Sequence, residues 1–218
     1  KVLPNDDPNL IAEQFASHYS LIRLEQAWDS QINNAQGLEE VLVAVLDTGI
    51  APLTGPEAHP DWASVDTDAS DSTGKLRYGF DFVSEPSIDG DDTPGIDSDA
   101  TDIGPADNTA FHGTHVAGTV AAPTGNGIGV AGVGRSVSIM PLRVLGDCGC
   151  GSTFDILQGN LYAAQLPNSS DIVPNEKADI INMSLGGGGF SQVAQDVYAD
   201  VRAEGVIIIA AAGNESTD

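Results

Sequence analysis

Positive charge is scarce in this sequence of 218 residues, which has 8 lysines and arginines against 32 aspartates and glutamates and a formal net charge of −24. The imbalance argues against nucleic acid or an anionic membrane as a partner, because both would repel a polyanion. Two compatible explanations for the excess are bound calcium, which would neutralise part of the charge, and a surface adapted to salty water, where screening is strong. For most of the carboxylates, a solvated surface without a specific role is the simplest interpretation.

Long apolar runs, internal repeats and linkers are also missing. No stretch approaches the roughly 20 apolar residues that are needed to cross a bilayer, and no basic-then-apolar leader precedes Lys1. We therefore expect a processed chain that has lost any signal peptide and pro-segment. With 41% apolar residues, the chain is long enough to bury one α/β core, so a single domain is predicted.

The sequence has only two cysteines, Cys148 and Cys150, which are one residue apart. This spacing fits neither a C-x-x-C redox motif nor a zinc site, which would need two more ligands close by. We expect a short-range disulfide in an exported protein. The alternative is that each cysteine pairs with another cysteine beyond Asp218, because so small a ring is strained.

Apolar strand-like segments alternate with helix-like segments along the chain. The predicted strands span residues 41–46, 78–83, 138–145, 178–184 and 205–212, and the predicted helices span 112–122, 154–164 and 193–204. Such alternation with short links specifies an α/β fold with a parallel sheet and right-handed crossovers.

One segment, 111–122, places a histidine at the head of a helix made mostly of small residues. The small side chains recur at helical spacing and leave one face almost bare, so the backbone can pack close to a sheet: Gly113, Ala117, Gly118, Ala121 and Ala122. His112 would be held rigidly there. The alternative is a helix in which His112 and His115 merely cap the end and satisfy the core.

A second segment ends in an acidic residue. The apolar run 41–46 is typical of a strand that is buried on both faces, and Asp47 follows at its carboxyl end. Catalytic groups gather at that edge in open α/β sheets. The alternative is that Asp47 only forms an Asx-type turn with Thr48 and Gly49.

Together these two motifs, VAVLDTGI and HGTHVAGTVAA, resemble the subtilisin-like serine proteases, or subtilases. The later segments NMSLGG (182–187) and AAAGN (210–214) match two further blocks of that family in the same order. The resemblance covers most of the chain from Val41 onward. It implies a three-layer α/β fold with a central, mostly parallel sheet and helices on both faces, and residues 1–218 would be the N-terminal portion of a single catalytic domain.

The resemblance also implies catalytic roles. Peptide hydrolysis by a serine enzyme needs a general base near the hydroxyl and a buried carboxylate that orients the imidazole. By resemblance, His112 is the base, Asp47 is the carboxylate, and Asn214 donates a hydrogen bond to the oxyanion. His115, one turn further along, is interpreted as a packed, hydrogen-bonded core histidine.

Substrate contacts follow from the same resemblance. An extended protein or peptide substrate would pair with the edge segment Ser184, Leu185 and Gly186 through main-chain hydrogen bonds. The pocket for the side chain before the scissile bond would be lined by Ala211, Ala212 and Gly213. Their small size predicts a roomy, apolar pocket.

The serine nucleophile of the family is not found. It lies in a G-T-S-M-A block after the oxyanion asparagine, no such block occurs before Asp218, and Ser152, Ser184 and Ser191 belong to other motifs. Three explanations stay open: a chain nicked after Asp218, a truncated chain, or an inactive homologue. We favour a nicked protease with its C-terminal fragment still associated, because loss of the closing third of the sheet would expose core strands.

Two calcium sites are expected. The acidic tract 89–102 alternates carboxylates with small residues and can wrap a hard cation, although a solvated acidic loop is the alternative. Its candidate ligands are Asp89, Asp91, Asp92, Asp97, Asp99 and Asp102. The second site is implied by the resemblance, with side-chain oxygens from Gln14, Asp61 and Asn126 and carbonyl oxygens from Thr124, Ile128 and Val130.

The sequence thus predicts a secreted, calcium-stabilised endopeptidase that acts outside the cell on proteins or peptides. The alternative from another functional class is a non-catalytic, acidic calcium-binding module on the same scaffold. A second polypeptide that carries G-T-S-M-A would distinguish the two.

Overall fold

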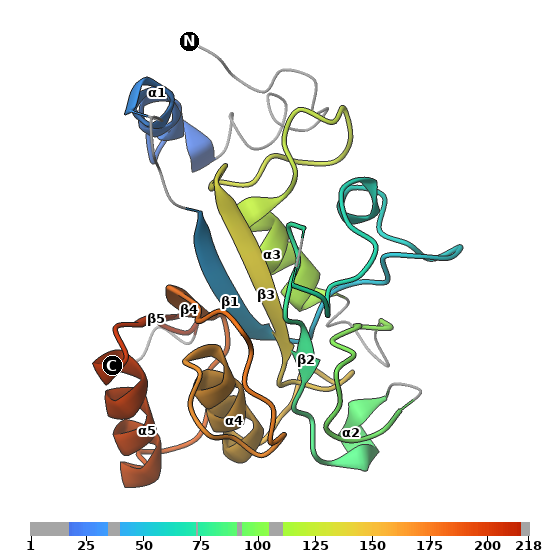
Figure 1. The fold of residues 1–218 in the computed structure, drawn as a ribbon, viewed down its shortest axis with the longest axis vertical. Helices are drawn as coiled ribbons and strands as arrows, with labels where there is room; N and C mark the ends of the chain where they lie inside the picture. The colour runs from blue at the N-terminus through green and yellow to red at the C-terminus, as the bar shows by residue number, and fades with distance from the viewer. Residues whose placement is uncertain (1–17, 35–39, 73, 91–92, 105–110, 215–218) are drawn as a thin grey trace.

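The computed structural model describes residues 18–34, 40–72, 74–90, 93–104 and 111–214 (Figure 1). The helices are α1 (Leu24–Asn34), α2 (Pro86–Asp89), α3 (His112–Ala121), α4 (Thr153–Ala163) and α5 (Gln192–Ala203), and a short 3₁₀ turn spans Trp62–Ser64. The strands are β1 (Val41–Asp47), β2 (Phe80–Asp81), β3 (Val137–Arg143), β4 (Ile180–Met183) and β5 (Ile207–Ala210).

The five strands form one sheet in the order β2-β3-β1-β4-β5, and all neighbouring strands run parallel. Strand β1 lies at the centre and pairs over its whole length with β3, from Val41 opposite Val137 to Asp47 opposite Arg143. The parallel α/β sheet predicted from the alternating pattern is confirmed.

Helices cover both faces of this sheet, with α3 on one side and α4 and α5 on the other (Figure 1). Side chains alternate across β1 as the strand period requires. Leu42, Ala44 and Leu46 pack in the cluster beside α4, whereas Val43 and Val45 pack in the cluster beside α3. The expected three-layer arrangement is therefore confirmed.

The N-terminal part packs through aromatic side chains. Trp28 of α1 is 1% exposed and stands edge-on to Tyr19, and its indole N–H donates to the carbonyl oxygen of Val133 at 2.8 Å. The tyrosine hydroxyl donates to the carbonyl oxygen of Ala131 at 2.5 Å. These bonds tie α1 and the segment before it to the loop that follows α3.

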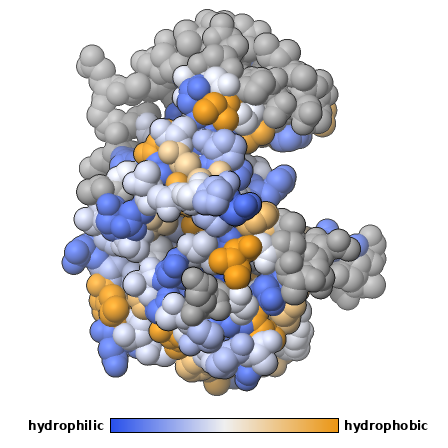
Figure 2. Space-filling model, turned by 90° about the vertical axis from the view of Figure 1, so that its right-hand side faces the viewer, coloured by the Kyte–Doolittle hydropathy of each residue, from blue (hydrophilic) through white to orange (hydrophobic). Residues whose placement is uncertain are grey.

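Strand β5 ends the described sheet with apolar side chains in solvent. Ile207 is 58% exposed and Ile209 is 51% exposed, whereas Ile208 between them packs toward the α4 and α5 side. Figure 2 shows the molecule turned by 90° from Figure 1, and on that face hydrophobic side chains form separate groups among hydrophilic ones. Among the described residues, no helix is long and apolar enough to span a membrane.

Candidate active site

Asp47 is placed by the alternation of β1. Because Val43 and Val45 face α3, Asp47 two residues further on faces the same way, at the carboxyl end of the central strand. Its side chain is completely buried. A charged group lies here at the sheet edge where parallel α/β proteins place their chemistry.

His112 is the first residue of α3 and meets Asp47 directly. Its Nδ1 lies 2.7 Å from Asp47 Oδ1, and about half of the His112 side chain is exposed. A carboxylate can only accept this bond, so Nδ1 carries the hydrogen and Nε2 is left to accept a proton. Residues 65 apart in the sequence thus form an acid–base pair.

Burial raises the pKa of Asp47 above its ordinary value, and the hydrogen bonds from His112 and from the Thr48 N–H oppose that rise. The Thr48 N–H donates to Asp47 Oδ1 at 2.8 Å. The other oxygen, Oδ2, is buried and has no hydrogen-bond partner among the described residues. Both hydrogen bonds, from His112 and from Thr48, therefore reach the same oxygen of Asp47, Oδ1.

A glycine allows α3 to approach the Asp47 loop. A Cβ on Gly113 would lie 3.0 Å from the backbone nitrogen of Gly49 and 3.1 Å from Cβ of Asp47, and still closer to the Gly49 carbonyl oxygen. The predicted close approach is confirmed for Gly113. Gly118 has no described atom within 4 Å of such a Cβ, so close approach does not explain it within the described residues.

A cleft of about 1000 Å³ opens beside His112. The predicted substrate segment Ser184, Leu185 and Gly186 lines it, and so does Ala211 after β5. Ala212, Gly213 and Asn214 are described and exposed, but they do not line this cleft. Their predicted roles stay predictions.

The two cysteines form the expected disulfide. The bridge lies in the loop after β3, and Gly149, Cys150 and Gly151 line the same cleft as His112. The sequence motifs do not predict that this loop lines the cleft. Its position directly after a predicted strand, at the carboxyl edge of the sheet, is the signal that could have found it.

The subtilase family model matches residues 39–218. This chain belongs to the subtilase family. The matched range contains both Asp47 and His112, as do the motifs on which the resemblance rests.

Curated relatives of this subtilase include an extracellular protease of Xanthomonas campestris, 34% identical over 99% of this chain and 35% of the relative. An extracellular basic protease of Dichelobacter nodosus is 35% identical over all of this chain and 35% of the relative. A solved structure of proteases from Pseudoalteromonas arctica PAMC 21717 is 37% identical with a TM-score of 0.75, over 96% of this chain and 59% of that one. The chain thus spans about a third of the length of the two curated relatives.

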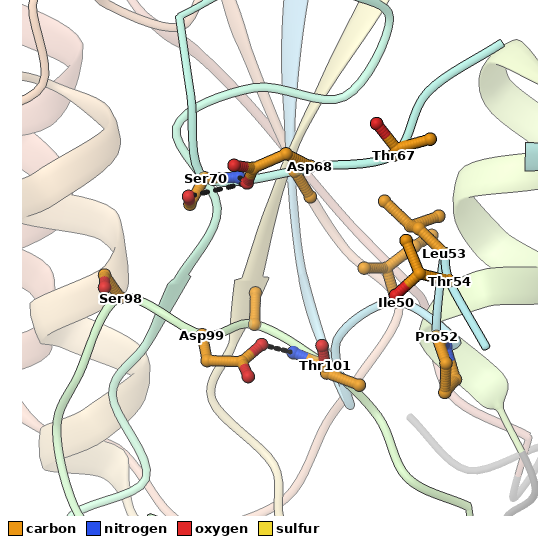
Figure 3. Close-up of a pocket in the computed structure, with 12 residues that line it drawn as sticks. Ile50, Pro52, Leu53, Thr54, Thr67, Asp68, Ser70, Ser98, Asp99 and Thr101 are labelled. Carbon is orange, nitrogen blue, oxygen red and sulfur yellow. Dashed lines mark hydrogen bonds between the residues drawn. The ribbon is translucent and has the colours of Figure 1, made fainter. Parts of the chain in front are cut away.

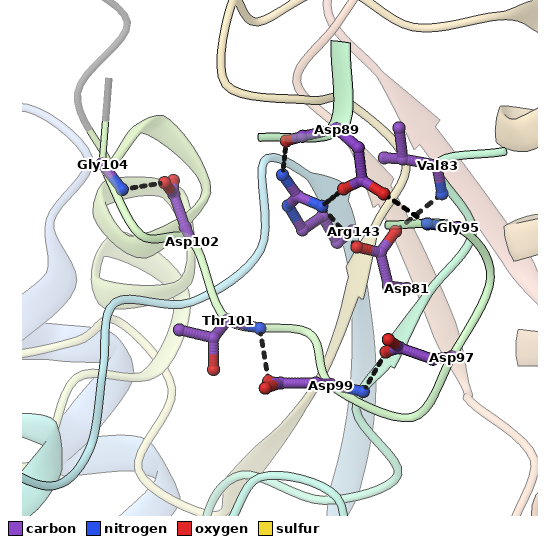
Figure 4. A network of polar contacts seen from close by, with 10 residues as sticks. All are labelled: Asp81, Val83, Asp89, Gly95, Asp97, Asp99, Thr101, Asp102, Gly104 and Arg143. Atoms are coloured by element: carbon purple, nitrogen blue, oxygen red, sulfur yellow. Dashed lines mark hydrogen bonds and ion pairs between the residues drawn. The ribbon is translucent and has the colours of Figure 1, made fainter. Parts of the chain in front are cut away.

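The structure corrects the reading of the acidic tract in this subtilase. Asp89 is buried and pairs with the guanidinium of Arg143, which also pairs with Asp81 and donates to the carbonyl oxygen of Asp89 (Figure 4). One cation serves two carboxylates. Burial raises the pKa of Asp81 to about 7, although Arg143 opposes the rise.

The other described aspartates of the tract accept hydrogen bonds from nearby backbone N–H groups. Asp97 and Asp99 each accept a backbone N–H two residues ahead, and Asp102 accepts from Gly104 N–H and from the Thr48 hydroxyl. No three acidic, cysteine or histidine side chains among the described residues converge as metal ligands. The structure contradicts the prediction for Asp89, whose carboxylate is paired with Arg143, whereas Asp97, Asp99 and Asp102 stay predicted ligands that the described residues do not bring together, and Asp91 and Asp92 lie outside the described residues.

The second predicted calcium loop does bring its residues together. Asp61 is 2% exposed and accepts from Asn126 Nδ2 at 2.9 Å and from Val130 N–H at 3.2 Å, while Ile128 N–H donates to Asn126 Oδ1. The side-chain oxygens of Asp61 and Asn126 are of the kind that calcium prefers, whereas the carbonyl ligands predicted from Thr124, Ile128 and Val130 stay predictions. Gln14 lies outside the described residues.

His115 does not behave as predicted. Its side chain is exposed on α3, one turn after His112, and it is not packed in the core. The helix turns it away from the sheet because the buried positions around it are Thr114 and Ala117. The prediction of a packed core histidine is wrong.

A pocket of about 430 Å³ that the sequence did not indicate lies on another part of the surface (Figure 3). Asp68 and Ser70 form one side, Asp99 and Thr101 form another, and Ile50 lies between them. Both carboxylates accept hydrogen bonds from their own loops, Asp68 from Ser70 and Asp99 from Thr101 N–H. Because these hydrogen bonds satisfy the carboxylates of Asp68 and Asp99, the pocket needs no ligand to explain them.

Proposed function

We propose that this chain is the N-terminal portion of a secreted serine endopeptidase domain, in which His112 is the general base and Asp47 the orienting carboxylate. The observation that carries the proposal is the 2.7 Å contact between the two side chains at the mouth of a cleft. The names of the relatives, both extracellular proteases, support secretion and a protein substrate.

The chemistry follows from the tautomer. Asp47 fixes the hydrogen on Nδ1, so Nε2 can take the proton of a serine hydroxyl as its oxygen attacks the peptide carbonyl. His112 then returns that proton to the leaving amine. The buried negative charge of Asp47 stabilises the imidazolium between these steps, and Asn214 is the proposed donor to the oxyanion.

The cleft fits an extended peptide. Residues 184–186 continue beyond β4 along its wall, where main-chain groups could pair with a substrate strand. Leu145, Met183 and Tyr198 give the same cleft an apolar lining. We therefore propose that the cleft prefers substrates with apolar side chains.

The serine comes, in this proposal, from sequence after residue 218. The exposed faces of Ile207 and Ile209 on the last described strand support this, because apolar side chains on a sheet face need a covering layer. A C-terminal segment of the same protease, continuous or nicked, would supply both that layer and the nucleophile.

Hydrolysis of a fluorogenic peptide by the full-length protein tests the proposal. We expect Asp47→Asn to lower kcat by about 10⁴-fold, because the amide favours the wrong imidazole tautomer. His112→Ala should remove most activity, whereas the matched change His115→Ala, at an exposed histidine of the same helix, should leave most of it. Equal loss in both histidine variants, or no hydrolysis by the wild-type protein, would favour a non-catalytic module.

We further propose that Asp61, Asn126 and the carbonyl oxygens of 124–130 hold one calcium ion that stabilises this loop. The buried carboxylate of Asp61, which Asn126 and the Val130 N–H hold beside this loop, supports the proposal. A chelator should lower the melting temperature of the wild-type protein and leave that of Asp61→Asn unchanged. An equal effect of the chelator on both proteins would contradict the assignment.

A further inference from the structure

The helix that carries His112 has no cap of its own. Phe111, the residue before it, has a φ of +55° and makes no side-chain hydrogen bond to the first turn. The N–H groups at a helix start need acceptors. Gly113 finds one at a distance, because its N–H donates to the hydroxyl of Thr48 at 3.0 Å.

Thr48 therefore bonds both to Asp47 and to the first turn of the helix that carries His112. Its backbone N–H donates to Asp47 Oδ1, and its hydroxyl oxygen accepts from the helix that starts with His112. The side chain is 4% exposed, so water does not compete for these bonds. One residue thus links the position of the acid to that of the base.

The hydroxyl can accept from Gly113 only if its own hydrogen points elsewhere. That hydrogen goes to Asp102, whose Oδ2 lies 2.6 Å from Thr48 Oγ1. Asp102 is 5% exposed and is itself held, because Oδ1 accepts from Gly104 N–H at 2.9 Å and its own N–H donates to the Ile50 carbonyl oxygen at 2.7 Å (Figure 4). A negative charge near a helix N-terminus is also favourable.

We propose that Asp102 is a positioning residue for catalysis, which acts through Thr48 to fix the start of α3 and so the His112–Asp47 contact. The inference rests on the proposed function, and Asp102 itself takes no part in the chemistry. Without the carboxylate, the Thr48 hydroxyl hydrogen would be free to turn to another acceptor. The Thr48 oxygen would then no longer be held in the orientation that accepts the Gly113 N–H.

The first test compares kinetics of hydroxyl variants in the full-length protein. Thr48→Val removes the hydroxyl at equal size and should lower kcat by roughly 10-fold to 100-fold with little change in KM, because misalignment of about 1 Å costs that much. Thr48→Ser keeps the hydroxyl and should restore most of kcat. Thr119→Val, at an exposed threonine of the same helix, is the matched control.

Asp102 is tested by Asp102→Ala and Asp102→Asn. The alanine variant should lose kcat as Thr48→Val does, and the double variant should lose no more than either single variant, since both act through one bond. Asparagine keeps an acceptor and should lie between alanine and wild type. Asp200→Asn, on the exposed face of α5, controls for the loss of one negative charge.

Nuclear magnetic resonance separates this inference from the proposed function, because it needs no activity. The Nδ1 proton of His112 should give a slowly exchanging signal in wild type and Thr48→Ser, and the signal should broaden or vanish in Thr48→Val and Asp102→Ala. An unchanged signal in those two variants, or kinetic losses that appear in KM instead of kcat, would overturn the positioning role. Failure of the proposed function would instead appear as an inactive wild type.

Discussion

A methyl group added at Gly113 should move the base away from the acid. In Gly113→Ala, the new Cβ would meet the Gly49 backbone and Cβ of Asp47 at distances of 3.1 Å or less. Backbone atoms cannot rotate away, so α3 must shift relative to the loop after β1. Because Gly113 directly follows His112, this shift should displace the His112 side chain from Asp47.

The expected size follows from these distances. Restoring ordinary contacts requires a separation of the order of 1 Å, and a misplacement of that size costs about 100-fold in rate, so kcat/KM should fall by about that factor. Overpacking costs about 1–3 kcal/mol of unfolding free energy, and the better helix propensity of alanine offsets about 1 kcal/mol of it. The protein should therefore stay folded.

The assay is peptide hydrolysis alongside urea unfolding, with Gly132→Ala as control. That change forces a Cβ against the backbone of Ala121 and Ala122, so it strains the other end of α3. It should lower stability by about 1–3 kcal/mol and leave kcat/KM near wild type. If both variants lose activity in proportion to stability, or Gly113→Ala keeps full activity, the alignment argument is refuted.

Three further outcomes are expected. Arg143→Met should lower the unfolding free energy by about 3–5 kcal/mol, measured by urea titration, because Asp81 and Asp89 would stay buried without their cation; a loss below 1 kcal/mol would contradict this. The pKa of Asp81 is raised from 3.8 to about 7 in the folded state, so the folded protein holds an extra proton between those values. Stability should then fall as pH rises from about 4 to about 7 and level off above, by up to about 4 kcal/mol, and Asp81→Asn should remove this slope. Replacing Cys148 and Cys150 together by serine should raise KM with kcat retained, since their loop lines the cleft and closes too few residues to add much stability; an equal fall in kcat would argue against a binding role.

The parts of the site that follow local rules could be predicted from the sequence. An apolar run with an acid at its end predicts Asp47 at the sheet edge, and small residues at helical spacing predict that His112 stands at the head of a helix packed close to the sheet. Both inferences need only strand period, helix period and the behaviour of parallel sheets. The meeting of the His112 and Asp47 side chains is implied only by the resemblance to the subtilases.

The parts that depend on distant partners could not be predicted. Asp89 and Asp102 looked like members of one acidic loop, but Arg143 and Thr48, far along the chain, give them different roles. Arg143 itself lies inside the predicted strand 138–145, and nothing in the sequence marks it as the partner of two aspartates. Exposure of His115 likewise depends on which face of α3 meets the sheet, and two histidines three residues apart do not reveal it.

The central claim is that Asp47 and His112 activate a serine that lies after residue 218. Its most direct test is reaction of the full-length protein with a fluorophosphonate probe, followed by peptide mapping of the adduct by mass spectrometry. The account predicts one modified serine, in sequence beyond Asp218, and no modification in the His112→Ala variant. An adduct on Ser152, Ser184 or Ser191, or no adduct at all, would contradict it.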